Sequence, residues 1–196
     1  MLIRILCTVL FLCIVAVQTI DTELFKKYNE VVTYDYYFKK YTKRYFSPGF
    51  DWRFFKAQAI AESGLEERPI SYAGAVGIMQ ILPKTYEQIK KNNSTIIKGS
   101  LRNARWNIAA GISYDRDLWD MFKNNKPFKD KLNFMFGSYN SGVYNIIQAQ
   151  HSATRKGLNP NSWSSIEKSL QQVTGRQSHQ TINYVQKIWA IKGVLN

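Results

Sequence analysis

Cysteine and histidine are scarce in this sequence. The chain of 196 residues carries two of each. Both cysteines, Cys7 and Cys13, lie in an apolar run near the N-terminus, so the rest of the chain offers neither a disulfide framework nor a cysteine metal site. The histidines, His151 and His179, are too few to hold a metal by themselves. These shortages exclude a disulfide-stapled fold and a zinc enzyme, and no metal or cofactor is expected.

Long hydrophobic runs are also missing. The longest apolar run, at residues 5–17, follows Arg4 and is shorter than the roughly 20 residues that cross a bilayer. A basic residue before a short apolar run is typical of a secretory signal, so residues 1–20 predict an exported protein. Residues 15–18 match a cleavage site only loosely, which leaves open an uncleaved anchor and an association with the membrane. Cys13 lacks the small residues that precede a lipidated cysteine.

Acidic residues are few compared with basic ones. The chain has 14 acidic and 27 basic residues, which give a net charge of +13. Such an excess predicts an anionic partner. Nucleic acid is one candidate, but no nucleic-acid-binding motif is present and the N-terminal signal points out of the cytoplasm. The anionic surface of a bacterial cell wall fits both observations, and a single monomeric domain is expected from the chain length.

Helical periodicity predicts a central helix at residues 52–63 with one acid, Glu62, in its last turn. Glu62 shares a helix face with Trp52, Phe55 and Ala59. Other apolar residues fill the remaining faces, which leaves for water only Arg53, Lys56, Gln58 and Ser63. Burial against aromatic rings and the negative end of the helix dipole both raise the pKa of a carboxyl, as a general acid requires. A structural Glu paired with Arg53 or Lys56 is the alternative.

A glycine-rich loop follows this helix. Gly64 ends the helix, and Pro83 suits the first turn of a new helix that runs to about residue 91. The small residues between them favour a loop that closely approaches a ligand. Met79 and Gln80 lie just before the new helix, where backbone N–H groups and an amide can face a polar ligand. A structural turn with a core methionine is the alternative.

Several short motifs follow one another in a fixed order between about residues 50 and 190. The first group comprises Glu62-Ser63, Ser71, Gly74-Ala75, Gly77-Ile78-Met79-Gln80, Pro83 and Thr85. The second group comprises Asn107-Ile108, Gly111 to Tyr114, Ser138-Tyr139-Asn140-Ser141-Gly142 and Tyr184-Val185. In this order they resemble the lysozyme-like lytic transglycosylases of the soluble lytic transglycosylase (SLT, family 1) type. Ile78 stands where that family has Leu, and Ser138 where it has Ala; both changes are small.

The resemblance implies a fold and a reaction. The fold would be mainly α and lysozyme-like, with at most a short antiparallel β piece around residues 66–82. A single Glu, here Glu62, would protonate the glycosidic oxygen of peptidoglycan and then take a proton from the sugar's own C6 hydroxyl. This step closes a 1,6-anhydro ring, and the substrate's N-acetyl group takes the place of a second acid.

Other site roles follow from the same resemblance. Ser63 and Ser71 would support Glu62 and the acetamido group, and Met79 and Gln80 would line the sugar subsites. Asn140 and Tyr139 would hold the sugar and form the cleft wall, and Tyr184 would contact the site near Glu62. Met79 and Tyr139 are also good packing residues, so a purely structural role is the alternative for both.

The remaining acids offer no evident second catalytic carboxylate. Glu66 and Glu67 follow the helix end in a solvated loop, and a surface-like helix face carries Asp115, Asp117 and Asp120. Glycosidases that use water usually need two carboxylates. A hydrolase of goose-lysozyme or chitinase type and a non-enzymatic glycan-binding protein on the same fold remain the alternative functions.

The chain divides into three parts. Residues 1–20 form the signal or anchor, residues 21–48 an aromatic and basic extension of one or two helices, and residues 49–196 the catalytic domain. The aromatic residues of the extension either pack on the domain or form a patch that faces glycan or membrane. Further helices are expected at about 104–124, 128–140, 142–154, 164–173 and 179–192. Ser164 and Glu167 have the spacing of a capping box.

Overall fold

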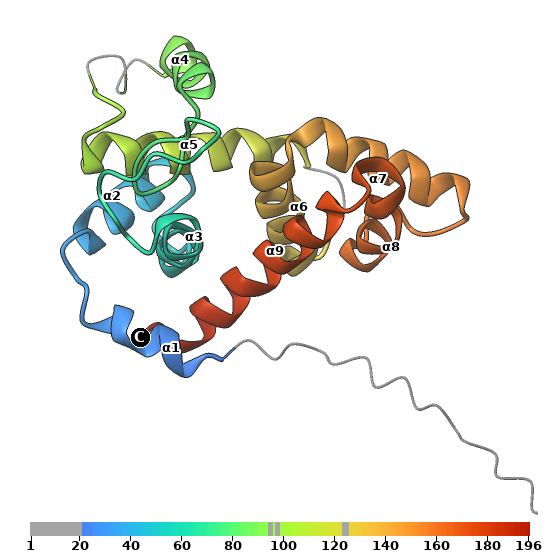
Figure 1. Cartoon of the computed structure of the whole chain (residues 1–196), viewed down its shortest axis with the longest axis horizontal. Helices are drawn as coiled ribbons and strands as arrows, with labels where there is room; N and C mark the ends of the chain where they lie inside the picture. Colours follow the sequence, from blue (N-terminus) through green and yellow to red (C-terminus); the bar gives the residue numbers. More distant parts are fainter. Residues whose placement is uncertain (1–20, 94–95, 97–98, 123–125) are drawn as a thin grey trace, which may run out of the picture.

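Helices make up nearly all of the regular structure (Figure 1). The computed structural model describes residues 21–93, 96, 99–122 and 126–196. The helices are α1 Glu23–Lys26, α2 Asp35–Tyr45, α3 Arg53–Ser63, α4 Pro83–Asn92, α5 Ala104–Met121, α6 Phe128–Ser141, α7 Val143–Arg155, α8 Trp163–Thr174 and α9 Gln177–Val194, with a 3₁₀ turn at Lys27–Asn29 after α1.

The mainly helical prediction is confirmed. Each helix expected after residue 83 is present within a few residues of its predicted bounds, although the predicted end of α5 extends beyond the described residues. In the described part of the chain the only β pairing consists of two isolated antiparallel bridges, Ile70–Val76 and Val76–Ile81. They lie where a short β piece was expected. The predicted signal at residues 1–20 lies outside the described residues, and none of the described helices combines the length and apolarity needed to cross a membrane.

Helix α3 is the central helix of the fold. It packs against α9 on one side and α2 on another, so every residue from 54 to 60 is buried. Gly64, with a φ of 66°, ends the helix in the left-handed conformation, as the sequence predicts. The expectation that Lys56 and Gln58 face water is wrong, because they are 3% and 0% exposed. A helix covered on all sides has no solvent face for its polar residues to occupy.

The N-terminal extension is part of this packing. Phe38 and Tyr41 of α2 are buried in the same core cluster as α3 and α5. Lys56 of α3 reaches back to the extension, where its Nζ lies 2.8 Å from Asp35 Oδ1 and donates to the Val31 carbonyl at 2.8 Å. Most aromatic residues of α2 therefore pack on the domain, Tyr36 excepted, and an ion pair compensates the burial of Lys56.

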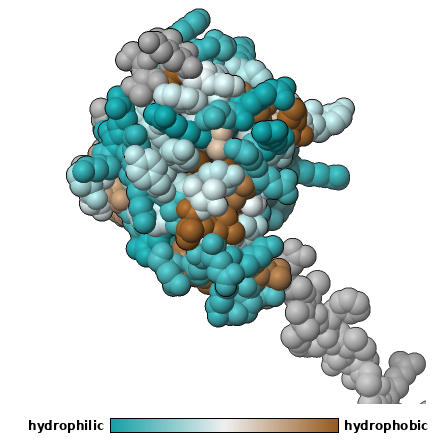
Figure 2. Space-filling model, turned by 90° about the vertical axis from the view of Figure 1, so that its left-hand side faces the viewer, coloured by the Kyte–Doolittle hydropathy of each residue, from teal (hydrophilic) through white to brown (hydrophobic). Residues whose placement is uncertain are grey.

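The outer surface of the extension is mostly hydrophilic. Figure 2 views the side of the molecule that carries α1 and α2, and it shows a hydrophobic patch surrounded by polar and charged side chains. In this segment the large exposed apolar residues are Leu24, Val32 and Tyr36. Exposed basic residues accompany them, among them Lys39 and Lys40. The extension thus combines a buried aromatic face with a basic outer face.

Helices α6 to α8 lie to the right of α3 in Figure 1, and α9 runs from this group down and to the left, toward α1. Helix α6 packs on α5, α7 and α9, and α8 closes the group by packing on α7 and α9. The capping box predicted at α8 is wrong, because the helix begins at Trp163 and Ser164 lies inside its first turn. Glu167 instead accepts a hydrogen bond from Trp163 Nε1 at 2.9 Å.

Candidate active site

Glu62 lies in the last turn of α3, where α3 meets α9. Its Oε1 accepts a hydrogen bond of 2.5 Å from the hydroxyl of Tyr184 on α9. Lys187, one turn further along α9, donates from Nζ to the Ala61 carbonyl at 3.1 Å, which brings its charge close to the carboxyl. Tyr184, which is 122 positions from Glu62 in the sequence, thus orients this acid.

Burial away from water raises the pKa of Glu62 from its usual 4.5 to about 7. The hydrogen bond from Tyr184 and the positive charge of Lys187 act in the opposite direction and limit the rise in pKa. The direction is the one that the sequence predicts. An acid with a pKa near neutrality can donate a proton in one step and accept one in the next, because both protonation states are populated.

The loop after Glu62 is held in a fixed shape by backbone contacts. Ser63 Oγ donates to the Ile78 carbonyl at 2.8 Å, which ties the end of α3 to the far side of the loop. Ser71 Oγ accepts from the Ala75 N–H at 3.0 Å and closes a turn. Both predicted site serines therefore have backbone partners, and their hydroxyls shape the loop around Glu62.

Asn107 of α5 anchors the same loop from below. Its Oδ1 accepts from the Met79 N–H at 2.7 Å, and its Nδ2 donates to the Val76 carbonyl at 2.8 Å. Gly77 has a φ of 78°, and a Cβ at this position would lie 2.5 Å from Asn107 Nδ2. Glycine is required here for both reasons. The sequence motif contained Asn107 without indicating this role.

Met79 is a core residue at the base of the site. Its side chain is 0% exposed and packs against Gly111 of α5, where any Cβ would collide with it. Its carbonyl accepts a hydrogen bond of 2.7 Å from the Tyr139 hydroxyl on α6. The side chain therefore packs in the core, and the backbone of Met79 joins the loop to α5 and α6.

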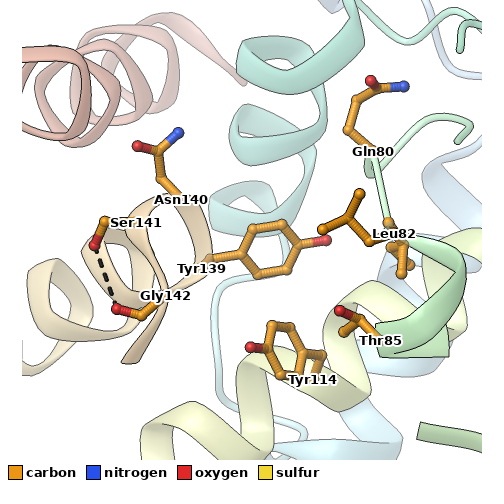
Figure 3. A pocket seen from close by; sticks show the side chains of 9 residues that line it. Gln80, Leu82, Thr85, Tyr114, Tyr139, Asn140, Ser141 and Gly142 are labelled. Carbon is orange, nitrogen blue, oxygen red and sulfur yellow. Dashed lines mark hydrogen bonds between the residues drawn. The ribbon is translucent and has the colours of Figure 1, made fainter. Parts of the chain in front are cut away.

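A cavity of about 290 Å³ opens beside this loop (Figure 3). Gln80, with a φ of 46°, lines it from the loop, and its Nε2 donates to the Gly77 carbonyl at 2.9 Å. Tyr139 and Asn140 line it from the end of α6, and Asn140 Oδ1 accepts from Thr181 Oγ1 at 3.0 Å. Its other lining residues are Ile81, Leu82, Thr85, Tyr114, Ser141 and Gly142.

Glu62 does not itself line this cavity. Tyr139 lines the cavity, and the negative charge of Glu62 acts on its hydroxyl. The pKa of Tyr139 is raised far above its usual value first by burial and then by the negative charges of Asp115 and Glu62. Among the predicted subsite residues, Gln80, Tyr139 and Asn140 meet at the cavity and Tyr184 contacts Glu62 directly. The Ser63 and Ser71 hydroxyls bond to the surrounding backbone, and the backbone of Met79 bonds to the side chains of Asn107 and Tyr139.

A second acid, Asp115, lies in the interior near Glu62. The expectation that Asp115 faces the surface is wrong, because it is 0% exposed and accepts a 3.2 Å hydrogen bond from Gln58 Nε2 on α3. Burial raises its pKa well above the usual value, the hydrogen bond from Gln58 lowers it, and the charge of Glu62 raises it. Among the described residues, Asp115 Oδ2 and Gln58 Oε1 have no hydrogen-bond partner. Two buried acceptors without a donor indicate that Asp115 is held as a neutral acid, whose proton supplies one.

Comparison with known proteins identifies the fold and the family. A family model described as the transglycosylase SLT domain matches residues 37–161, which is more than half of the chain. The chain belongs to the transglycosylase SLT domain family. The match begins inside α2 and includes Glu62, the glycine-rich loop and the end of α6.

Relatives of the SLT family agree with this assignment. The chain is 28% identical over 136 residues to membrane-bound lytic murein transglycosylase F of Desulfosudis oleivorans, which covers 69% of the chain and 28% of that protein. The protein of the same name from Shewanella pealeana is 27% identical over 167 residues, which covers 84% of the chain and 32% of that protein. The chain thus spans about a third or less of the length of these relatives.

Solved structures show the same SLT fold. The 70-kDa soluble lytic transglycosylase of Escherichia coli superposes with a TM-score of 0.61 at 24% identity, over 83% of this chain and 24% of that one. A complex of the 70-kDa soluble lytic transglycosylase with bulgecin A gives a TM-score of 0.62 at 23% identity, over 87% of this chain and 25% of that chain. These likenesses confirm the lysozyme-like fold expected from the sequence.

Proposed function

We propose that this SLT-family chain is an exported peptidoglycan lytic transglycosylase. It cleaves the β-1,4 bond between N-acetylmuramic acid and N-acetylglucosamine without water and leaves 1,6-anhydro-N-acetylmuramic acid ends. The observation that carries the proposal is Glu62, a partly exposed acid whose pKa is raised to about 7 and which the Tyr184 hydroxyl orients. The resemblance of the motifs and the names of the relatives support the same reaction.

One acid suffices for both proton transfers in this scheme. Protonated Glu62 donates its proton to the glycosidic oxygen as the bond to the anomeric carbon breaks. The acetamido oxygen of the substrate stabilises the positive charge at that carbon. The carboxylate of Glu62 then removes the proton from the C6 hydroxyl, and the C6 oxygen bonds to the anomeric carbon. This proton transfer regenerates the protonated acid. An intramolecular hydroxyl has an effective molarity that water does not match.

The proposal assigns no second catalytic role to another acid. A nucleophilic carboxylate lies about 5–5.5 Å from the acid in retaining glycosidases, and a basic one about 6.5–9.5 Å away in inverting enzymes. Asp115 is completely buried beneath Gln58 and does not reach a substrate. Glu66 and Glu67 are exposed on the loop. A non-hydrolytic reaction is therefore favoured over the lysozyme-like alternative.

The other site residues have supporting roles in this proposal. Tyr184 orients Glu62 and stabilises its carboxylate form. Gln80, Asn140 and Tyr139 line the cavity that receives a sugar unit. Ser63, Ser71 and Met79 hold the loop so that its backbone faces the acetamido group.

Localisation and partners follow from the charge and the N-terminal signal. We assign the protein to the periplasm or cell wall, as a monomer without cofactor or nucleic-acid partner, with residues 49–196 as the catalytic domain and residues 21–48 as an extension of its core. A net charge of +13 favours an anionic wall.

Binding to intact sacculi should therefore weaken as salt shortens the Debye length from about 10 to about 3 Å. Turnover of short uncharged glycans should change little over the same range, and equal salt dependence of both would contradict electrostatic steering.

The products of a peptidoglycan digest test the reaction. Mass spectrometry should find muropeptides that are lighter than hydrolysis products by one water, and borohydride should not reduce their new ends. If borohydride labels nearly all new ends, water is the nucleophile and the protein is a lysozyme. If purified sacculi lose no turbidity with the wild-type protein, the fold serves only to bind glycan.

A further inference from the structure

A second groove lies on the face where α6, α8 and α9 meet. Its volume is about 510 Å³, within the range of ligand sites. The residues that line this α6–α8–α9 groove are Lys129, Asp130, Asn133, Ser162, Trp163, Ser164, Glu167, Val185, Gln186 and Trp189. None of them lines the cavity beside Tyr139.

The groove lies away from the catalytic acid. Trp189 packs on Phe54 in the first turn of α3, with ring centroids 5.2 Å apart. Glu62 is in the last turn of the same helix, eight residues further on, and a helical rise of 1.5 Å per residue separates the two positions by about 12 Å. A ligand in the groove would therefore not contact Glu62.

Two carboxylates of the groove keep unused oxygens. Asp130 Oδ1 accepts from the Trp163 N–H at 3.3 Å, and Glu167 Oε1 accepts from Trp163 Nε1 at 2.9 Å. Among the described residues, no lysine or arginine forms an ion pair with either acid. Burial raises the pKa of Glu167, and the negative charge of Asp130 raises it further. Lys129 lines the same groove and the charge of Asp130 acts on Lys126, but neither lysine is within ion-pair distance of these two acids.

The groove also offers an unused donor on a buried side chain. Asn133 is 5% exposed, and its Oδ1 accepts a hydrogen bond of 2.6 Å from Trp189 Nε1. This bond fixes the amide, so that Nδ2 is its donor, and within the described structure Nδ2 has no hydrogen-bond partner. A buried amide that is held by its oxygen and keeps its donor free is arranged to bind something outside the protein.

The surrounding indole rings supply an apolar wall. Trp163 is 5% exposed and packs on Gly137 of α6. Trp189 is half-buried and lines the groove, and the Lys129 ammonium lies over its ring, with Nζ 5.3 Å from the ring centroid. The groove therefore combines an apolar wall with two acceptors and one buried donor.

The geometry points to a second saccharide-binding site in the α6–α8–α9 groove, outside the catalytic cleft. A sugar hydroxyl is both donor and acceptor, so neighbouring hydroxyls can donate to Asp130 and Glu167 while another accepts from Asn133 Nδ2. The apolar face of the pyranose ring would lie on the Trp189 indole, where it would displace the Lys129 ammonium from the ring. An ammonium ion would satisfy the two acids but would leave the amide donor unpaired. This inference rests on the proposed glycan substrate, because a second hold on the same strand raises the local concentration of substrate at the first.

The indole N–H groups of Trp163 and Trp189 allow a direct test, because both are hydrogen-bonded to groove residues. Tri-N-acetylchitotriose is titrated into the full-length Glu62→Gln protein, and the indole signals are followed by NMR. We expect saturable shifts of these two signals. Glu167→Gln keeps the shape and removes one charged acceptor, so it should weaken this binding about tenfold. Glu30→Gln, which removes one exposed charge elsewhere, should leave the binding unchanged.

Three results would overturn the second site: no shift of either signal, equal affinity in Glu167→Gln, or a shift caused by lysine amide and not by the sugar. A kinetic comparison separates this inference from the proposed function. In the wild-type background, Glu167→Gln should raise KM on intact sacculi and leave kcat on a short muropeptide unchanged. If anhydro ends form but no indole signal shifts, the groove fails and the transglycosylase proposal stands. If the indole signals shift but no anhydro ends form, the groove binds saccharide and the transglycosylase proposal fails.

Discussion

Two carboxyls, one partly buried at the end of α3 and one completely buried in the middle of α5, differ in what surrounds them. Glu62 and Asp115 both have a pKa raised first by burial. Glu62 also has a hydroxyl donor and a lysine nearby, and it adjoins a loop that opens to a cavity. Asp115 has one amide donor and no exposure. Burial alone therefore raises a pKa, whereas access to substrate and a donor for the charged form make an acid useful in catalysis.

Of the substitutions that test this comparison, Glu62→Gln should lower activity the most. The amide keeps the shape of Glu62 and removes the proton that titrates. Release of anhydro products from sacculi should fall by at least roughly 10²–10⁴-fold, the usual contribution of general acid–base catalysis. Circular dichroism should show an unchanged fold. A variant that clears sacculi at nearly the wild-type rate would remove Glu62 from the mechanism.

The pH dependence of stability should differ between wild type and Glu62→Gln. The pKa of Glu62 is about 7 in the fold against 4.5 for the ordinary group, so the folded protein binds more protons between these values. The contribution of the neutral acid is complete below about pH 4.5 and is lost as the pH rises through about 7. The free energy of unfolding of wild type should therefore drop by about 2–3 kcal/mol relative to the variant between pH 4.5 and 8. Urea unfolding at both pH values measures this, and parallel curves would contradict the raised pKa.

Tyr184→Phe should have an intermediate effect. The Tyr184 hydroxyl stabilises the charged form of Glu62, so its removal raises the pKa of Glu62 above 7 and moves the pH–rate profile in the alkaline direction. A hydrogen bond to a charged group is worth about 1.5–3 kcal/mol, so kcat should fall by about tenfold or more. If only KM changes and the profile stays in place, Tyr184 binds substrate and does not orient Glu62.

Asp115→Asn should have the smallest effect. Asparagine can still pair with the Gln58 amide, and the mechanism assigns Asp115 no proton transfer. The rate at which anhydro products are released from sacculi should stay within about threefold of wild type. Asp115→Leu, which leaves Gln58 buried without its partner, should cost about 1–3 kcal/mol of stability. A loss of activity in Asp115→Asn as large as in Glu62→Gln would identify Asp115 as the second acid and support a hydrolase.

The sequence predicts much of the fold because its signals are local. Gly64 and Pro83 punctuate the chain where α3 ends and α4 begins, as expected. The apolar repeats locate the later helices within a few residues. Ser164 and Glu167 have the spacing of a capping box, but α8 begins at Trp163, one residue before Ser164. Trp163 packs in the core beside Gly137. Local spacing does not contain that contact.

The errors concern polar residues inside the protein. Lys56, Gln58 and Asp115 were expected in water, because periodicity distinguishes two faces of a helix and assigns polar residues to the outer one. Helix α3 has no outer face, since α2 and α9 cover it. Each of the three residues has a partner on another segment, and such pairing leaves no local sequence pattern.

The sequence by itself determined the acid, the loop and the helices of this protein. Glu62, the glycines that follow it and the apolar repeats act over a few residues, so their consequences can be read along the chain. The tertiary structure alone decided that Tyr184 orients Glu62, that Asp115 lies buried under Gln58 and that Trp163 and Trp189 border one groove. Gln58 and Asp115 are 57 positions apart, and Tyr184 is 122 from Glu62. Packing of whole helices brings these groups together, and it depends on every buried contact at once.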